Sequence, residues 1–130
     1  MEARTKQEKF DLLEDTKKYY TEDVTRRSVT PRQHCAYSGA TLNKVHSDGC
    51  AIGRLLDEEL KLYLDRCYKN KNVSDIWVYL PETVTSYGRP FLKHLQSFHD
   101  SPLNWNENGL TICGEEEYSL IKSRINIEAY

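Results

Sequence analysis

Apolar residues recur at helical intervals between Arg54 and Cys67, and charged residues fall between them. The apolar set is Leu56, Leu60, Tyr63, Leu64 and Cys67, and the polar set is Asp57, Glu58, Glu59, Lys61, Asp65 and Arg66. This period is typical of an amphipathic helix that packs one side onto a core. The acidic residues stand in the first turns, where they suit the positive end of the helix dipole. The chain is therefore expected to be built mainly from helices.

Three more segments have the same period. The first spans residues 4–24, with Phe10, Leu12, Leu13, Tyr19, Tyr20 and Val24 as its stripe. The second begins at Pro90, which suits a first helical turn, and ends near Asp100. It should bury Phe91, Leu92, Leu95 and Phe98. The third opens at Gly114 and Glu115 to Glu117, and it carries Tyr118, Ile121 and Ile125.

Residues 34–53 differ from the helical segments. "HCAY" and "GCAIG" are two short extended pieces joined by a polar, glycine-bearing connection, which indicates a hairpin-like element. Residues 75–80, within "DIWVYLPE", fit a strand or a buried helical turn equally well. The predicted fold is a mainly α (α+β) single domain over residues 1–130. It has about four helices and one small two-stranded hairpin-like element.

Charge and cysteine content limit the function classes. The formal net charge is −2, and acidic and basic side chains are interleaved near the start, so non-specific nucleic-acid binding is disfavoured. No apolar run is long enough for a membrane span, and the charged N-terminal region does not look like a secretory signal. We therefore expect a cytoplasmic protein that does not engage membranes. Its four cysteines are expected to be free thiols, as is usual in that compartment.

Cys50 stands between two glycines in "HSDGCAIGRLL", just before a helical pattern. It could be a nucleophile with His99 as its base, in a cysteine-dependent hydrolase or transferase. Asp100 adjoins His99, but neighbouring residues of a helix point in different directions, so we expect it to orient the imidazole poorly. The favoured interpretation is a small buried residue whose flanking glycines let backbone approach closely. On that interpretation no residue is catalytic.

A metal site is a second alternative for this region. Its ligands would be Cys35, His46 and Cys50, with His34 or His99 as a further donor, in a small zinc-stabilised interaction module. Structural zinc sites usually contain closely spaced ligand pairs, and no CxxC pair is present. Buried thiols are therefore favoured over a metal, and no cofactor is expected.

A third set of residues could bind a small nucleotide-like ligand. Aromatic rings would stack on a base, and arginines would grip phosphate. The predicted ligand-binding residues are Arg54, Trp77, Tyr79, Tyr87, Arg89, Lys93 and His99. The phosphate-binding GxxxxGK[ST] and GxGxxG motifs, and the catalytic HExxH and GxSxG motifs, are absent from the sequence. Binding is therefore favoured over catalysis.

Three segments resemble a group of small uncharacterised proteins of bacteriophage and bacterial genomes. The group has a C-x-Y element, a C-A-[IV]-G-x-L stretch followed by acidic residues, and an L-Q-x-x-H-D segment leading to a tryptophan. The matching positions are Cys35, Tyr37, Cys50, Ala51, Gly53, Leu55, Asp57, Glu58, Leu95, Gln96, His99, Asp100 and Trp105. The resemblance covers residues 35–110, and the helix at 4–24 lies outside it.

The resemblance implies a phage or mobile-element setting. We therefore expect a non-enzymatic accessory protein with a host-takeover or anti-defence role. It would bind a host protein or a small nucleotide-like signalling ligand inside the bacterial cell. A monomer and a homodimer fit equally well, and the helix at 4–24 is a candidate surface for a second copy.

Overall fold

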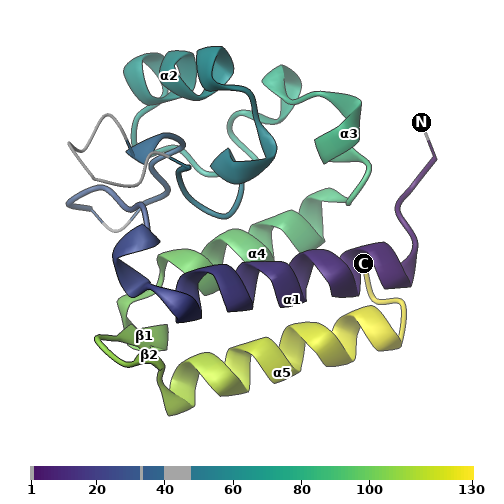
Figure 1. Ribbon diagram of the computed structural model, residues 1–130. Helices are drawn as coiled ribbons and strands as arrows, with labels where there is room; N and C mark the ends of the chain where they lie inside the picture. Colours follow the sequence, from purple (N-terminus) through teal and green to yellow (C-terminus); the bar gives the residue numbers. More distant parts are fainter. Residues whose placement is uncertain (1, 33, 40–47) are drawn as a thin grey trace.

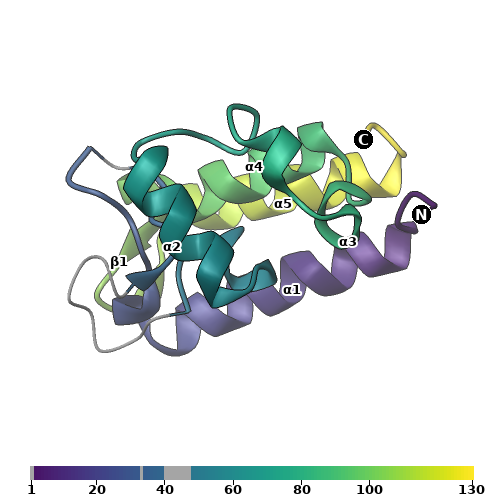
Figure 2. The ribbon, with the colours of Figure 1, turned by 90° about the horizontal axis from the view of Figure 1, so that it is seen from above.

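Three long helices run side by side and contribute ten of the buried core residues: α1 (Lys6–Glu22), α4 (Arg89–Asp100) and α5 (Ile112–Asn126). The computed structural model describes residues 2–32, 34–39 and 48–130. Within it, α5 packs against both α1 and α4 and runs antiparallel to them (Figure 1). The shorter helices α2 (Glu58–Cys67) and α3 (Glu82–Thr85) lie above this layer (Figure 2). The mainly helical single domain predicted from the sequence is confirmed.

The predicted helix at 4–24 forms as α1, and its start has a chemical reason. Thr5 accepts the Glu8 amide on its hydroxyl, while the Glu8 carboxylate accepts the Thr5 amide, which is a capping box. Leu12, Leu13 and Tyr20 are buried in the shared core. The apolar side of α1 formed by these residues is therefore used within the chain.

Helix α2 begins later than its sequence pattern suggests. Asp57 accepts the Leu60 amide and caps the helix, and a 3₁₀ turn, η3 (Gly53–Leu55), precedes it. Leu64 is buried as expected, but two positions are reversed. Cys67 is exposed, and Lys61 is buried with its ammonium donating to the Asp48 carbonyl at 3.0 Å. A long lysine stem can pack on the core while its charge reaches a carbonyl at the rim.

The two-stranded hairpin lies elsewhere than predicted. Strands β1 (Trp105–Asn106) and β2 (Gly109–Leu110) pair antiparallel, in a stretch that reads as a loop. In the predicted region, Cys50 donates its amide to the Ala36 carbonyl at 2.9 Å, and Cys35 forms an isolated bridge with Val29. The two extended pieces do meet, but without a ladder of pairs among the described residues.

Residues 75–80 are neither strand nor α-helix. They contain a 3₁₀ turn, η4 (Trp77–Tyr79), and Pro81 then caps the four-residue α3. Helix α4 begins and ends where its pattern predicts, with Phe91, Leu92, Leu95 and Phe98 buried. Two further 3₁₀ turns are η1 (Val24–Arg26) and η5 (Pro102–Asn104). None of the described helices combines the length and apolarity needed to cross a bilayer.

Candidate functional site

The predicted ligand-binding residues separate into several places. Arg54 lies beside α1, where its guanidinium pairs with Asp15 at 3.0 Å and covers the Tyr19 ring at 3.7 Å. Tyr79 lies in a tyrosine cluster, and its hydroxyl is hydrogen-bonded to the hydroxyl of Tyr68. Both residues already have partners within the chain.

Tyr87 also has a partner within the chain, in the segment that precedes α1. The Arg4 guanidinium lies 4.6 Å from its ring centroid, and Arg4 also donates to the Ser86 hydroxyl. These contacts tie the segment before α1 to the end of α3. Arg54, Tyr79 and Tyr87 therefore do not join one ligand site.

Trp77, Arg89 and Lys93 do come together. A hollow of about 400 Å³ at the start of α4 is lined by Ser74, Arg89, Pro90, Lys93 and His94. The Arg89 guanidinium lies 4.7 Å from the ring centroid of Trp77, which connects η4 to this hollow. Arg89 and Lys93 are four residues apart, so both project from one side of α4.

No described carboxylate forms an ion pair with Arg89 or Lys93. The N-terminus of α4 is also uncapped, since Gly88 provides no side-chain acceptor. Helix N-termini have a positive potential, which adds to that of the two side chains. The hollow is therefore suited to an anion.

His94 and Ser74 were missed in the sequence, although both line the hollow. His94 Nδ1 lies 2.6 Å from the hydroxyl of Tyr130. Burial, followed by the nearby Arg124 charge, lowers the pKa of His94, while burial raises the pKa of Tyr130 to about 12. A phenol that keeps its proton is the natural donor of this bond, which leaves the imidazole proton on Nε2. The four-residue spacing of Arg89 and Lys93 could have indicated that both project from one side of a helix. The contact between His94 and Tyr130 could not be predicted, because the two residues are 36 positions apart in the sequence.

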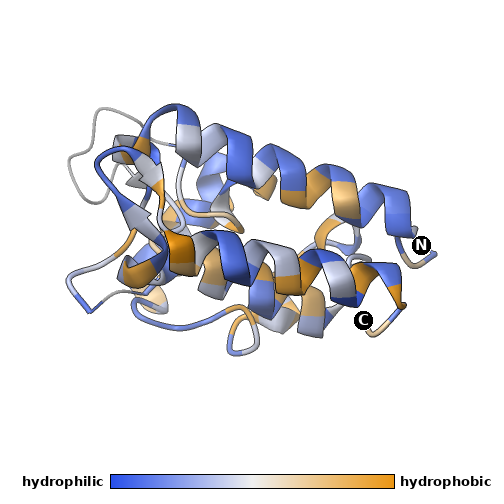
Figure 3. Cartoon of the chain, turned by 90° about the horizontal axis from the view of Figure 1, so that it is seen from below, coloured by the Kyte–Doolittle hydropathy of each residue, from blue (hydrophilic) through white to orange (hydrophobic). Residues whose placement is uncertain are grey.

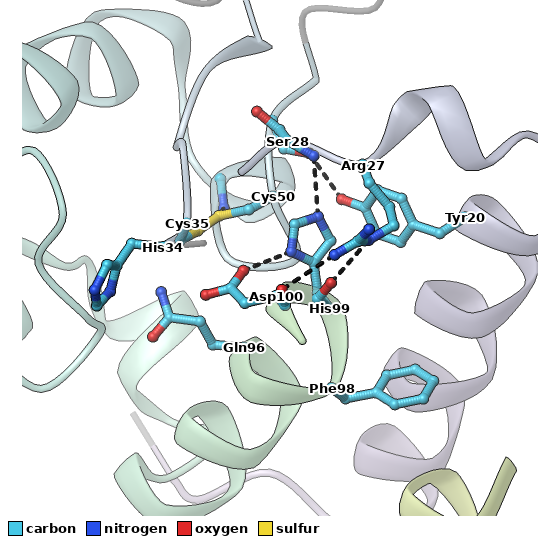
Figure 4. A network of polar contacts seen from close by, with 12 residues as sticks. Tyr20, Arg27, Ser28, His34, Cys35, Cys50, Gln96, Phe98, His99 and Asp100 are labelled. Atoms are coloured by element: carbon cyan, nitrogen blue, oxygen red, sulfur yellow. Dashed lines mark hydrogen bonds and ion pairs between the residues drawn. A yellow bond between two sulfur atoms is a disulfide. The ribbon is translucent and has the colours of Figure 1, made fainter. Parts of the chain in front are cut away.

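Cys35 and Cys50 form a disulfide, so the expectation of four free thiols is wrong for this pair (Figure 4). Their Cα atoms are 5.5 Å apart, within the range that disulfides span. Cys67 and Cys113 are free and exposed. The expectation came from the rarity of disulfides in cytoplasmic proteins. That rule is statistical and does not consider the distance between two particular cysteines.

The glycines around Cys50 act as predicted. A Cβ at Gly49 or at Gly53 would overlap the backbone carbonyl of Tyr37, and Gly49 also has a φ of +91°. Cys50 is fully buried between them. Backbone therefore crosses backbone at this corner, where a side chain does not fit.

His99 is fully buried and engaged on both ring nitrogens (Figure 4). Nε2 accepts the Ser28 amide at 3.2 Å, and Nδ1 lies 2.7 Å from the Asp100 carboxylate. The expectation that Asp100 would orient His99 poorly is therefore wrong. Asp100 is the last residue of α4, so no following turn constrains its side chain.

This arrangement lacks the parts that the Cys50–His99 nucleophile hypothesis requires. A disulfide sulfur is not a thiolate, and an imidazole nitrogen that accepts a backbone amide cannot also take a proton from a nucleophile. The Tyr20 ring makes a T-shaped contact with the His99 ring, with the two centroids 4.6 Å apart. His99 connects α4 to residues 27–28 and is not one of the residues that line the hollow at the start of α4.

The candidate metal ligands do not form a site in the described part of the chain. Cys35 and Cys50 are bonded to each other, His34 is exposed, and His46 lies outside the described residues. No group of three histidine, cysteine or carboxylate side chains suited to a metal occurs in the described ranges.

No protein-family model, no curated protein and no solved structure matches this chain. The resemblance to phage and bacterial proteins therefore stays a prediction.

Proposed function

We propose that this chain is a non-catalytic binding protein that holds a small phosphate-bearing ligand in the hollow at the start of α4. The observation that supports this is the meeting of Arg89, Lys93 and His94 around one hollow, where neither Arg89 nor Lys93 has a carboxylate partner among the described residues. Unpaired cations concentrated in one place favour an anionic occupant.

Each side chain offers a different contact to phosphate. The Arg89 guanidinium can bind two phosphate oxygens at once, and the Lys93 ammonium is a compact positive charge. The Ser74 hydroxyl and the His94 Nε2–H supply neutral donors. A hollow of about 400 Å³ is within the usual size range of small-molecule sites.

Trp77 suggests that the ligand includes a ring as well as phosphate. Its half-buried indole adjoins the hollow through Arg89, and a base could stack on the indole or on the guanidinium plane. With the phage-like resemblance, this supports a host signalling nucleotide as the occupant and an accessory role in host takeover or defence evasion. A host protein that presents a phosphate group is the alternative partner.

Titration calorimetry with pyrophosphate, ADP and adenosine tests this function. We expect pyrophosphate and ADP to bind and adenosine to fail, because the charged contacts provide most of the affinity. The double variant R89Q/K93Q should weaken binding at least about tenfold, since each charge-assisted hydrogen bond contributes about 1.5–3 kcal/mol. K18Q, which removes an exposed lysine of α1, is the matched control and should bind normally.

Two results would contradict the proposal: no heat with any phosphate compound, or equal affinity in R89Q/K93Q and the parent chain. Recovery of a host protein by the parent chain but not by R89Q/K93Q, without any nucleotide binding, would favour the protein alternative.

A further inference from the structure

Helix α5 is apolar on two opposite sides. Its buried side consists of Gly114, Tyr118, Ile121 and Ile125, which face α1 and α4. On the outer side, Ile112 is 81% exposed, Leu120 is 56% exposed, and Ile127, just past the helix end, is 71% exposed. At 3.6 residues per turn, these three residues lie within about 80° of one another, opposite the buried side. Figure 3 views the molecule from this side, with apolar segments along α5.

Most of the large apolar side chains exposed in the described part of the chain gather here. Leu103 of η5, next to the start of α5, is also exposed at 71% and extends the stripe. Several large apolar side chains exposed on one side of a helix are a candidate surface for contact with another molecule. We define the α5 outer face as Leu103, Ile112, Glu116, Leu120, Ser123 and Ile127.

The charges of α5 indicate what covers this face. Glu115, Glu116 and Glu117 are in its first half, whereas Lys122 and Arg124 are in its second half. A second α5 laid antiparallel on the first would place each acidic half over a basic half. A parallel arrangement would instead place like charges together. The charge distribution of α5 is therefore complementary to that of a second α5 that runs in the opposite direction. A two-fold symmetric contact requires such self-complementarity.

We propose that two copies of this chain associate through their α5 outer faces, with the two-fold axis passing between Ser119 and Leu120. Ile112 of one copy then faces Ile127 of the other, and Leu120 covers the small Ser119. Glu117, which also accepts a hydrogen bond from the Asn104 side chain, comes beside Arg124 of the second copy. Glu115, which pairs with Lys17 of its own chain at 3.5 Å, comes near Lys122 of the second copy. The symmetry repeats each of these contacts.

The surface next to Ile112 is shaped for such a contact. A hollow of about 470 Å³ is lined by Leu110, Thr111, Ile112, Glu115, Glu116 and Ser119. In the antiparallel arrangement, Ile127 of the second copy reaches this hollow. A single helix from each copy makes a small interface, so we expect a reversible dimer with a dissociation constant between about 1 µM and 1 mM.

Sedimentation equilibrium of two complementary charge variants tests the proposal. E115K/E117K reverses the acidic residue of each proposed ion pair, and K122E/R124E reverses the basic residue of each pair. Each variant alone should stay at 15.2 kDa, because like charges then face each other. An equimolar mixture should form a heterodimer, because every half again meets the opposite charge. Recovery on mixing also shows that both variants are folded.

The apolar contact is tested separately with L120E, which should remain monomeric. V78E is the matched control, since Val78 of η4 is 85% exposed and lies outside the α5 outer face. It should dimerise like the parent chain. A parent chain that remains at 15.2 kDa up to about 1 mM would overturn the proposal. So would dimers that persist in L120E, or a charge-variant mixture that stays monomeric.

Discussion

Ser28 donates its backbone amide to Nε2 of His99 over 3.2 Å, across 71 residues of chain. The same histidine holds Asp100 on its other nitrogen, and Arg27 donates to the backbone carbonyls of both His99 and Asp100. The end of α4 is thereby fastened to the segment that follows η1. This buried polar network gives His99 a structural role.

Replacing His99 with alanine should therefore destabilise the fold. The substitution leaves the buried Ser28 amide without an acceptor, at about 1–3 kcal/mol, and opens a cavity beside the Tyr20 ring. Urea denaturation measures the loss. H34A is the matched control, because His34 is exposed, and its stability should change by less than about 0.5 kcal/mol. Equal stability of H99A and the parent chain would contradict the structural role.

The Cys35–Cys50 disulfide should be detectable by differential alkylation. Without reductant, only Cys67 and Cys113 should react in the denatured chain, and reduction should release two more thiols. The sequence separation is 15 residues, so loss of the cross-link in C35A/C50A should cost about 3 kcal/mol of unfolding free energy. C67S/C113S should unfold like the parent chain. Four reactive thiols before reduction would disprove the bond.

Gly49→Ala should be more damaging than Gly88→Ala. Both glycines have a positive φ, +91° and +92°, so alanine is strained at either one. A Cβ at Gly88 meets no atom within 4 Å, whereas at Gly49 it overlaps the Tyr37 carbonyl. The steric term alone should add about 1–3 kcal/mol at Gly49. Thermal unfolding of the two variants side by side measures this difference, and similar melting temperatures would refute the close approach.

Stability should fall as His94 becomes protonated. Its pKa is lowered in the folded chain, chiefly by burial, so the unfolded chain binds the proton more readily. The free energy of unfolding is therefore unaffected at pH values well above 6.5, and it decreases as the pH falls through 6.5 toward the lower folded pKa. Denaturation curves across this range should show the decrease in the parent chain and a smaller one in H94Q. Identical pH dependence in the two proteins would exclude His94 as its source.

Local pattern was sufficient for the long helices. The apolar periods around Leu13, Leu64, Leu95 and Ile121 predict α1, α2, α4 and α5, and those residues are buried in the structure. The glycines around Cys50 also had the predicted role, because close backbone approach depends on a feature visible in the sequence, the missing side chain. Periodicity depends on neighbours within a few residues, so the sequence alone contains it.

The remaining features depend on contacts between distant segments. The Cys35–Cys50 bond, the Ser28–His99 hydrogen bond and the His94–Tyr130 contact each require a particular packing of the helices. The same packing placed Arg54 beside Asp15 of α1 and placed Trp77 beside Arg89. Residue type and spacing thus determined the long helices and the buried residues at the centre of each. Only the tertiary structure decided which polar side chains meet, because the distance between two segments is fixed by the core that holds them together.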